Sequence, residues 1–351
     1  MFELISNPRD VLESEFPVMG TPAEQLRFLL NYAVLAPSRH NAQPWLFKVD
    51  GDTVELYADR SRSLPVMDPD DRELTIGCGA ALANLIIAIR HFGYAPAVEI
   101  HSHHDQGRLL ARVTLETGVR ATSEEQRLFS AILQRRTNRQ PFEDRPLPAS
   151  LLSALEEMAM QEGASLRFVR EEETRYALAS LIATGDRMLW TDERFRQEVA
   201  TWTRPVESQA RDGVPAYALG KGEMGSYLGP LKIRTFMEQT ELHPHEAGGS
   251  PVLAVLWTFA DTWFDWLAAG QALEKILLRA AAEGVWASFF SQPIEVPALR
   301  TEILTLFGQT DFPQMVLRMG YGQQTPPTPR RSVRDVLLPR DGNVRPAPSR
   351  Y

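Results

Sequence analysis

Apolar residues occupy almost every side of a long stretch in the first half of the chain, from Ile76 to Tyr94. Gly79 and several alanines keep this stretch narrow, and a helix that is apolar all round is buried between other layers. Sliding the chain by 191 positions places Gly79 on Gly270 and Gly93 on Gly284. Both stretches end at a glycine that suits a left-handed C-cap. The pattern therefore predicts two copies of one central helix.

Amphipathic patterns come before both central helices. Residues Thr21–Leu35 and Pro148–Glu162 show the helical spacing of apolar positions, and each leads into a short strand pattern, at Trp45–Val49 and Leu166–Val169. Aligning the strands needs a shift of 120 positions and aligning the central helices needs 191, so the second copy carries 71 extra residues. These extra residues fall at about 170–250.

The repeat predicts two halves of one plan, at 1–122 and 123–338, followed by a tail at 339–351. The inserted segment at about 170–250 includes a glycine-rich run. Long inserted segments are often functional. Two uses remain open for it: a lid over a binding site, or simple cover for the surface of the duplicated fold.

Composition narrows the class of protein. The 351 residues are 44% hydrophobic and 23% charged, as in a soluble globular protein, and the net charge of −8 argues against general nucleic-acid binding. The most apolar stretch, Val252–Leu278, is interrupted by charged residues, so no membrane-spanning helix is expected. The single cysteine, Cys78, and the absence of an export signal favour the cytoplasm.

Some polar patterns are better explained by structure than by chemistry. The histidines at positions 101, 103 and 104 cluster near an expected hairpin, where solvated side chains account for them, so no metal site is expected. Ser38 and His40 lie close in sequence, but no nucleophile elbow surrounds them. A hydrolase is therefore not indicated.

The segment Pro37–Trp45 concentrates turn-forming, hydrogen-bonding and aromatic residues in one loop between two regular elements. Prolines near both ends stiffen it, while Ser38, Asn41 and Gln43 offer donors and acceptors suited to the edge of a planar, polar heterocycle. The form P-S-x-x-N-x-Q-P-W resembles the flavin-contacting loop of the FMN-dependent nitroreductases. An ordinary proline-bounded turn is the alternative interpretation.

Two basic segments strengthen the resemblance. Arg135-Arg136-Thr137-Asn138-Arg139 is similar to the segment that binds the flavin phosphate in that family, and Arg330-Arg331 is similar to the basic pair near its C-terminus. Arginine suits this task because its planar guanidinium matches phosphate oxygens. The first half has the loop but lacks the basic segments, whereas the second half has the basic segments and lacks the loop.

Nitroreductases normally form homodimers with two flavin sites at the interface. The complementary halves resemble the twin-domain, Acg-like branch, in which one chain mimics the dimer. The resemblance implies an α+β, three-layer nitroreductase-like fold, duplicated into a single-chain pseudo-dimer with one surviving flavin site. It implies a monomer that mimics a dimer, with further association left open.

The resemblance also implies the site. The expected FMN-binding residues are Pro37, Ser38, Asn41, Gln43, Arg135, Arg136, Thr137, Arg139, Ser288, Phe289, Arg330 and Arg331. No catalytic side chain is expected, because the flavin carries out the chemistry.

Several functions fit this reading. The first is an FMN-dependent oxidoreductase that passes electrons from NADH or NADPH to a planar small molecule such as a nitroaromatic or quinone. The alternative is a protein that stores or sequesters FMN under a lid and has little reductase activity. A third is a specialised dehydrogenase or deiodinase-like activity of the same fold. The sequence leaves the electron acceptor and the choice of nicotinamide open.

Overall fold

The computed structural model describes residues 6–101, 109–118, 120–219 and 252–339. The predictions made for the histidines at 103 and 104, for the glycine-rich run from residue 220 onward and for the tail beyond residue 339 lie outside these ranges.

The first half forms a four-stranded antiparallel sheet in the order β1-β2-β4-β3, with two helices on one face. Its elements are α1 (Pro22–Ala33), β1 (Trp45–Asp50), β2 (Thr53–Ala58), α2 (Arg72–His91), β3 (Tyr94–Ile100) and β4 (Leu109–Thr117).

The second half repeats this plan. Its elements are α4 (Ala149–Gln161), β5 (Ala164–Phe168), β8 (Val252–Thr258), α8 (Trp263–Ala282), β9 (Val285–Phe289) and β10 (Phe312–Tyr321). The second sheet is also antiparallel, in the order β5-β8-β10-β9, which is the order of the first sheet with each strand replaced by its counterpart. The predicted α+β fold and its internal duplication are confirmed.

The insertion separates β5 from β8, at the place where the first half has the tight turn Gly51-Asp52. Its described part holds α5 (Glu172–Thr191), α6 (Glu193–Trp202), β6 (Thr203–Arg204), β7 (Val214–Pro215) and η5 (Ala216–Leu219). Helix α5 packs with α9 (Gln292–Glu295) and α10 (Pro297–Phe307) on the outer face of the second sheet. Both faces of that sheet are therefore buried.

The remaining elements are short or peripheral. They are η1 (Pro8–Asp10), η2 (Glu13–Glu15), η3 (Arg39–Asn41), η4 (Arg60–Arg62), α3 (Ser123–Ile132) and α11 (Val333–Val336).

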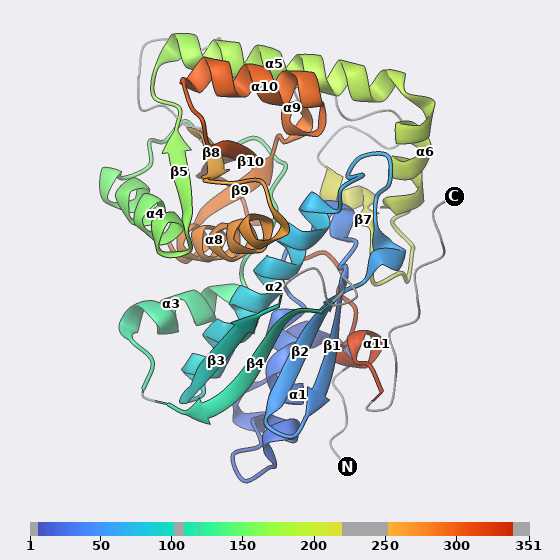
Figure 1. Cartoon of the computed structure of the whole chain (residues 1–351), viewed down its shortest axis with the longest axis vertical. Helices are drawn as coiled ribbons and strands as arrows, with labels where there is room; N and C mark the ends of the chain where they lie inside the picture. The colour runs from blue at the N-terminus through green and yellow to red at the C-terminus, as the bar shows by residue number, and fades with distance from the viewer. Residues whose placement is uncertain (1–5, 102–108, 119, 220–251, 340–351) are drawn as a thin grey trace.

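Helices α2 and α8 cross between the two sheets (Figure 1). Their backbones meet at Gly79 and Gly270: a Cβ on Gly79 would lie 2.1 Å from the carbonyl oxygen of Leu267, and one on Gly270 would lie 2.0 Å from that of Ile76. Only glycine permits this approach. Helix α2 is long and apolar enough to cross a membrane, but 83% of its most apolar stretch is buried within the protein, as expected of a core helix.

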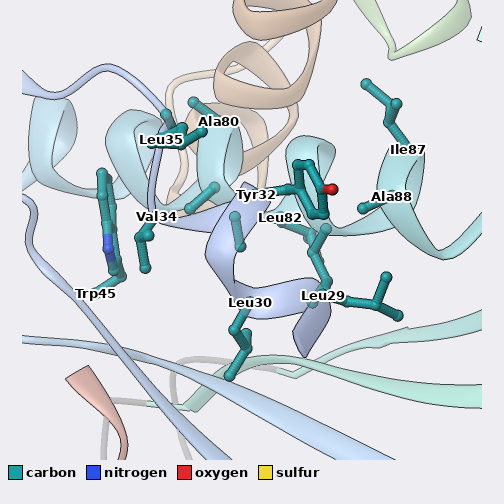
Figure 2. Packing of buried hydrophobic residues seen from close by; sticks show 14 of the residues in the cluster. Leu29, Leu30, Tyr32, Val34, Leu35, Trp45, Ala80, Leu82, Ile87 and Ala88 are labelled. Carbon is teal, nitrogen blue, oxygen red and sulfur yellow. The ribbon is translucent and has the colours of Figure 1, made fainter. Parts of the chain in front are cut away.

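The core of the first half fixes both ends of the loop between α1 and β1. Figure 2 shows Leu29 and Tyr32 of α1 near Leu82 of α2, and Leu30 pointing toward the strands of the sheet. Trp45 at the start of β1 belongs to the same cluster. All five side chains are buried completely. The loop therefore leaves and re-enters a close-packed core, which holds its ends in place.

We expect Gly79→Ala to destabilise the protein, although alanine is the better helix former by about 1 kcal/mol. The added methyl group would overlap backbone atoms of α8, and overpacking of this kind costs about 1–3 kcal/mol or more. Denaturant unfolding measures the change. Ser153→Ala, at an exposed site of α4, is the control and should leave stability within about 0.5 kcal/mol. A Gly79→Ala protein as stable as the wild type would contradict the close crossing.

Candidate functional site

The loop after α1 has a strained backbone. His40, Asn41 and Gln43 have positive φ angles of 48°, 56° and 52°, although none of them is glycine. Such conformations persist only where surrounding contacts hold them, and they cluster at functional sites. Part of the support is local, because the Ser38 hydroxyl accepts a hydrogen bond of 2.8 Å from the backbone N–H of Gln43.

The rest of the support comes from segments distant in the sequence. The Asn41 amide donates to the carbonyl oxygens of Gly213, at 3.0 Å, and Pro329, at 3.1 Å. The Gln43 amide donates to the carbonyl oxygen of Arg211 at 2.7 Å, and its oxygen accepts from the backbone N–H of Arg331 at 2.7 Å. The insertion and the C-terminal arm therefore meet on this loop.

A small cavity of about 30 Å³ opens beside the loop, between the two halves. It is lined by Arg9, Pro37, Ser38, Asn41, Arg135, Arg136, Thr137, Arg139, Val214, Pro326, Thr328 and Arg330. Pockets for whole ligands measure about 300–1,000 Å³, so the cavity accommodates an end group unless neighbouring segments move. Five of its lining residues are arginines.

Backbone carbonyls at helix ends orient these arginines. Arg135 and Arg330 both donate to the carbonyl oxygen of Leu35, just after α1, at 3.2 and 3.3 Å. Arg136 donates to the carbonyl oxygens of Leu133 and Arg135, just after α3, at 2.7 and 2.8 Å. The C-terminal end of a helix carries partial negative charge and stabilises cations. The loop is therefore connected directly to the arginines of the second half.

Several donors of the arginines that line the cavity have no hydrogen-bond partner in the described part of the chain. Arg135 Nε and Nη1, and the Nε atoms of Arg9, Arg136 and Arg330, are buried and have no hydrogen-bond partner among the described residues. Buried donors are normally satisfied. A ligand with several acceptor oxygens would satisfy these donors.

The pKa shifts of these arginines indicate the charge of such a ligand. Burial and the charge of Arg135 lower the pKa of Arg136 to about 10, and burial together with Arg136 and Arg135 lowers that of Arg9 to about 9. Burial, followed by the charges of Arg9 and Arg135, also lowers the pKa of Arg330. Mutually repelling cations with free donors fit an anion, and a phosphate group offers three acceptor oxygens.

Eight of the twelve predicted residues line the cavity. They are Pro37, Ser38, Asn41, Arg135, Arg136, Thr137, Arg139 and Arg330. The basic segment reaches the cavity because Thr137 forms a β-bridge with Ala287 of β9.

The other four predicted residues lie away from the cavity. Gln43 is buried completely, and Arg331 donates to its carbonyl oxygen at 3.0 Å, so these two join the loop to the C-terminal arm. Ser288 is buried and accepts a hydrogen bond from Arg318 at 3.2 Å. Phe289 packs against the core of the second half. Both residues belong to β9, and none of the residues that line the cavity comes from this strand.

Sequence reasoning missed Arg9. The N-terminal segment was expected to lack phosphate-binding residues, yet Arg9 lines the cavity and donates to the carbonyl oxygen of Leu133 at 3.3 Å. A lone arginine next to Pro8 has no motif that could have identified it. Val214 was also missed, because its place beside the loop depends on the path of the insertion.

Comparison with known proteins gives a consistent picture. No protein-family model matches the chain. A Mycobacterium tuberculosis (strain H37Rv) protein named among the NAD(P)H nitroreductases is 31% identical over 324 residues, covering 90% of this chain and 91% of the relative. The nitroreductase Acg of the same organism is 26% identical over 316 residues, or 89% of this chain and 95% of the relative.

A solved structure of a nitroreductase with bound FMN from Bacteroides fragilis is 17% identical and covers 56% of this chain and 88% of its own. Its TM-score of 0.35 is too low to bear on the function of this chain.

We expect inorganic phosphate to raise the melting temperature of the wild-type protein, because a ligand that binds only the folded state stabilises it. Arg136→Ala should lose most of this increase, since Arg136 supplies a free donor and a charge. Arg334→Ala, in the same arm as Arg330 but exposed, is the control and should keep it. Thermal unfolding in chloride and in phosphate at equal ionic strength measures the difference. An equal phosphate effect in all three proteins would contradict an anion site here.

Proposed function

Since the chain belongs to the NAD(P)H nitroreductase family, in its twin-domain Acg-like branch, we propose that it is an FMN-dependent oxidoreductase taking electrons from NADH or NADPH. The acceptor would be a planar small molecule such as a nitroaromatic or a quinone. Following the sequence argument, the protein would work in the cytoplasm as a single-chain pseudo-dimer with boundaries near residues 122 and 338.

The observation that carries this proposal is the arginine cavity at the end of the Pro37–Trp45 loop. Arg135, Arg136 and Arg330 line this cavity and would hold the FMN phosphate there. Hydrogen bonds to charged groups contribute about 1.5–3 kcal/mol each. Three such bonds supply a large part of a micromolar affinity.

The isoalloxazine ring of FMN would lie against the first half of the chain. Pro37, Ser38 and Asn41 are on the loop that contacts the cavity from that side. When bound, FMN supplies the hydride and electron transfer. The chain's residues would hold it, orient it and control its access to water. Asn41 would have to exchange its bond with Gly213 before its amide could reach a ring.

The hydrogen bond between Asn41 and Gly213 supports the second candidate function, which is sequestration of FMN. Arg211–Leu219, which we call the covering segment, lies on the binding loop: Gly213 exchanges hydrogen bonds with Asn41, and the carbonyl oxygen of Ala218 accepts from Arg139 at 3.2 Å. A segment in this position would restrict access of nicotinamide to a bound flavin.

Asp212 anchors the covering segment. It forms ion pairs of 2.9 Å with Arg62 of the first half and with Arg204. Burial acts to raise its pKa, but hydrogen bonds from Arg204 and Arg62 outweigh burial and hold the pKa below its usual value. The carboxylate therefore stays charged at neutral pH and keeps the segment on the loop.

We expect Asp212→Ala to release the covering segment and to raise the rates of FMN dissociation and NADPH oxidation severalfold. Glu207→Ala removes an exposed carboxylate from the same insertion and is the control. Stopped-flow fluorescence of released flavin measures the first rate, and absorbance at 340 nm the second. Unchanged rates in Asp212→Ala would reject the covering segment as a barrier.

Anaerobic addition of NADPH or NADH to the FMN-loaded protein should bleach the flavin absorbance within seconds if the protein is a reductase. Flavin that binds but stays oxidised would favour sequestration. Failure to bind FMN after reconstitution would overturn both functions. The measurement is a stopped-flow absorbance record at the flavin maximum, with photoreduction as the control that the bound flavin can be reduced.

A further inference from the structure

A buried carboxylate lies directly behind the arginine cavity, although it does not line the cavity. Glu274 is near the middle of α8, one turn after Gly270, and is buried completely. The repeat of 191 positions aligns it with Ala83 of α2. Of the two central helices, only the copy next to the arginine-rich segments carries a carboxylate at this position.

Glu274 is the ion-pair partner of Arg135. Its Oε1 lies 3.5 Å from Arg135 Nε, and the side chains are 0% and 3% exposed. The side chain of Asn84 is the hydrogen-bonding neighbour of the Glu274 carboxylate. Arg135 Nε and Nη1 have no hydrogen-bond acceptor among the described residues. The two charges attract each other without the short bonds of a tight salt bridge. Nε of Arg135 faces Glu274, so Nη1 is the donor that remains for a second anion.

We infer that Glu274 is a positioning residue for Arg135 that takes up a proton when a phosphate group enters the cavity. As a carboxylate it holds Arg135 in place, and as a neutral acid it leaves the charge of Arg135 to the phosphate. The inference rests on the proposed function, because the phosphate considered is that of FMN.

The physical reason is repulsion between like charges in a buried site. Burial raises the pKa of Glu274 to about 7, while the charge of Arg135, the side chain of Asn84 and the charge of Arg330 act to lower it. A phosphate dianion that binds the same arginines adds negative charge nearby and raises this pKa further. The carboxyl group then gains a proton at neutral pH.

Other charged groups on elements packed against α8 have partners of their own or are exposed. On α2, Arg72 pairs with Glu73, Arg90 with Glu125 and His91 with Glu13. From α3, Glu124 pairs with Arg279 at 3.1 Å, and Glu162, the residue after α4, pairs with Lys275. The strands β8 and β9, which also contact α8, contain no charged residue. Arg167 of β5 is exposed.

The sign of the pH dependence follows. As the pH falls below about 7, the pKa of Glu274, the side chain becomes neutral and no longer opposes the phosphate. Above pH 7 it is charged in the free protein, so binding of FMN must protonate it or tolerate the repulsion. The affinity for FMN therefore falls as the pH rises from about 7. The phosphate's own second ionisation, with a pKa of about 6, is complete in this range.

Isothermal titration calorimetry of the full chain with FMN at pH 7.5, in buffers of different ionisation enthalpy, counts the protons exchanged. We expect uptake of about half a proton per FMN bound if the pKa of Glu274 rises by about one unit. Riboflavin, which lacks the phosphate, is the control ligand and should bind without this uptake. FMN binding with no proton uptake would reject the inference and leave the proposed function intact. Failure of FMN to bind would instead reject the proposed function.

Glu274→Gln assigns the proton, because glutamine keeps the shape of the side chain and removes its charge. The ratio of the wild-type Kd for FMN to that of the variant should be near one at pH 6 and rise to about tenfold at pH 8.5, the ratio that one pKa unit corresponds to. A purely structural role for Glu274 would weaken FMN binding in the variant equally at every pH. If the variant does not fold, the proton count on the wild type still decides the question.

Discussion

The contact between Gly79 and Gly270 sets the distance between the two halves. Because neither residue has a side chain, α2 and α8 approach until their backbones touch, and the two sheets are held on either side. At this distance the loop that follows α1 reaches the arginines that follow α3. A wider crossing would separate Leu35 from Arg135 and Arg330, which share its carbonyl oxygen as acceptor. The composite site therefore depends on two glycines that lie outside it.

The arginine cavity stores unfavourable electrostatic energy. Burial of several guanidinium groups near one another is costly unless opposite charge is present. The fold supplies some through carbonyl groups at the ends of α1 and α3 and through Glu274. The donors that still lack acceptors indicate that this compensation is incomplete. A phosphate group would complete it, so ligand binding and folding stability should be coupled in this protein.

Much of the fold was predictable from the sequence because each pattern of apolar positions occurs in both halves. The central helices were placed correctly, but α2 begins at Arg72, before the apolar stretch, because the Asp68 carboxylate caps its first turn by accepting from the backbone N–H groups of Glu73 and Leu74. The long helix α5 inside the insertion was not predicted. Helix α5 packs against α9 and α10. The local sequence pattern does not reveal contacts with these later helices.

Residues of the candidate site could be predicted where they belong to a sequence motif. They could not be predicted where tertiary contacts decide whether a side chain reaches the cavity. Residues of the loop and the basic segment meet at one cavity, whereas Gln43 and Arg331 bond to each other and face away from it. Their residue types suit either a ligand or a structural bond, and only the path of the C-terminal arm decides between them. Arg9 reaches the cavity through the fold of the N-terminal segment, so its role could not be found from spacing.

The central claim is that two incomplete halves build one flavin site. The most direct test is the number of FMN molecules bound per chain, measured by flavin absorbance and amino-acid analysis on protein whose mass in solution has been determined by light scattering. The account predicts one FMN per chain, whatever the number of chains in the particle. Two FMN molecules per chain would show that the second half retains a site of its own and would contradict the claim.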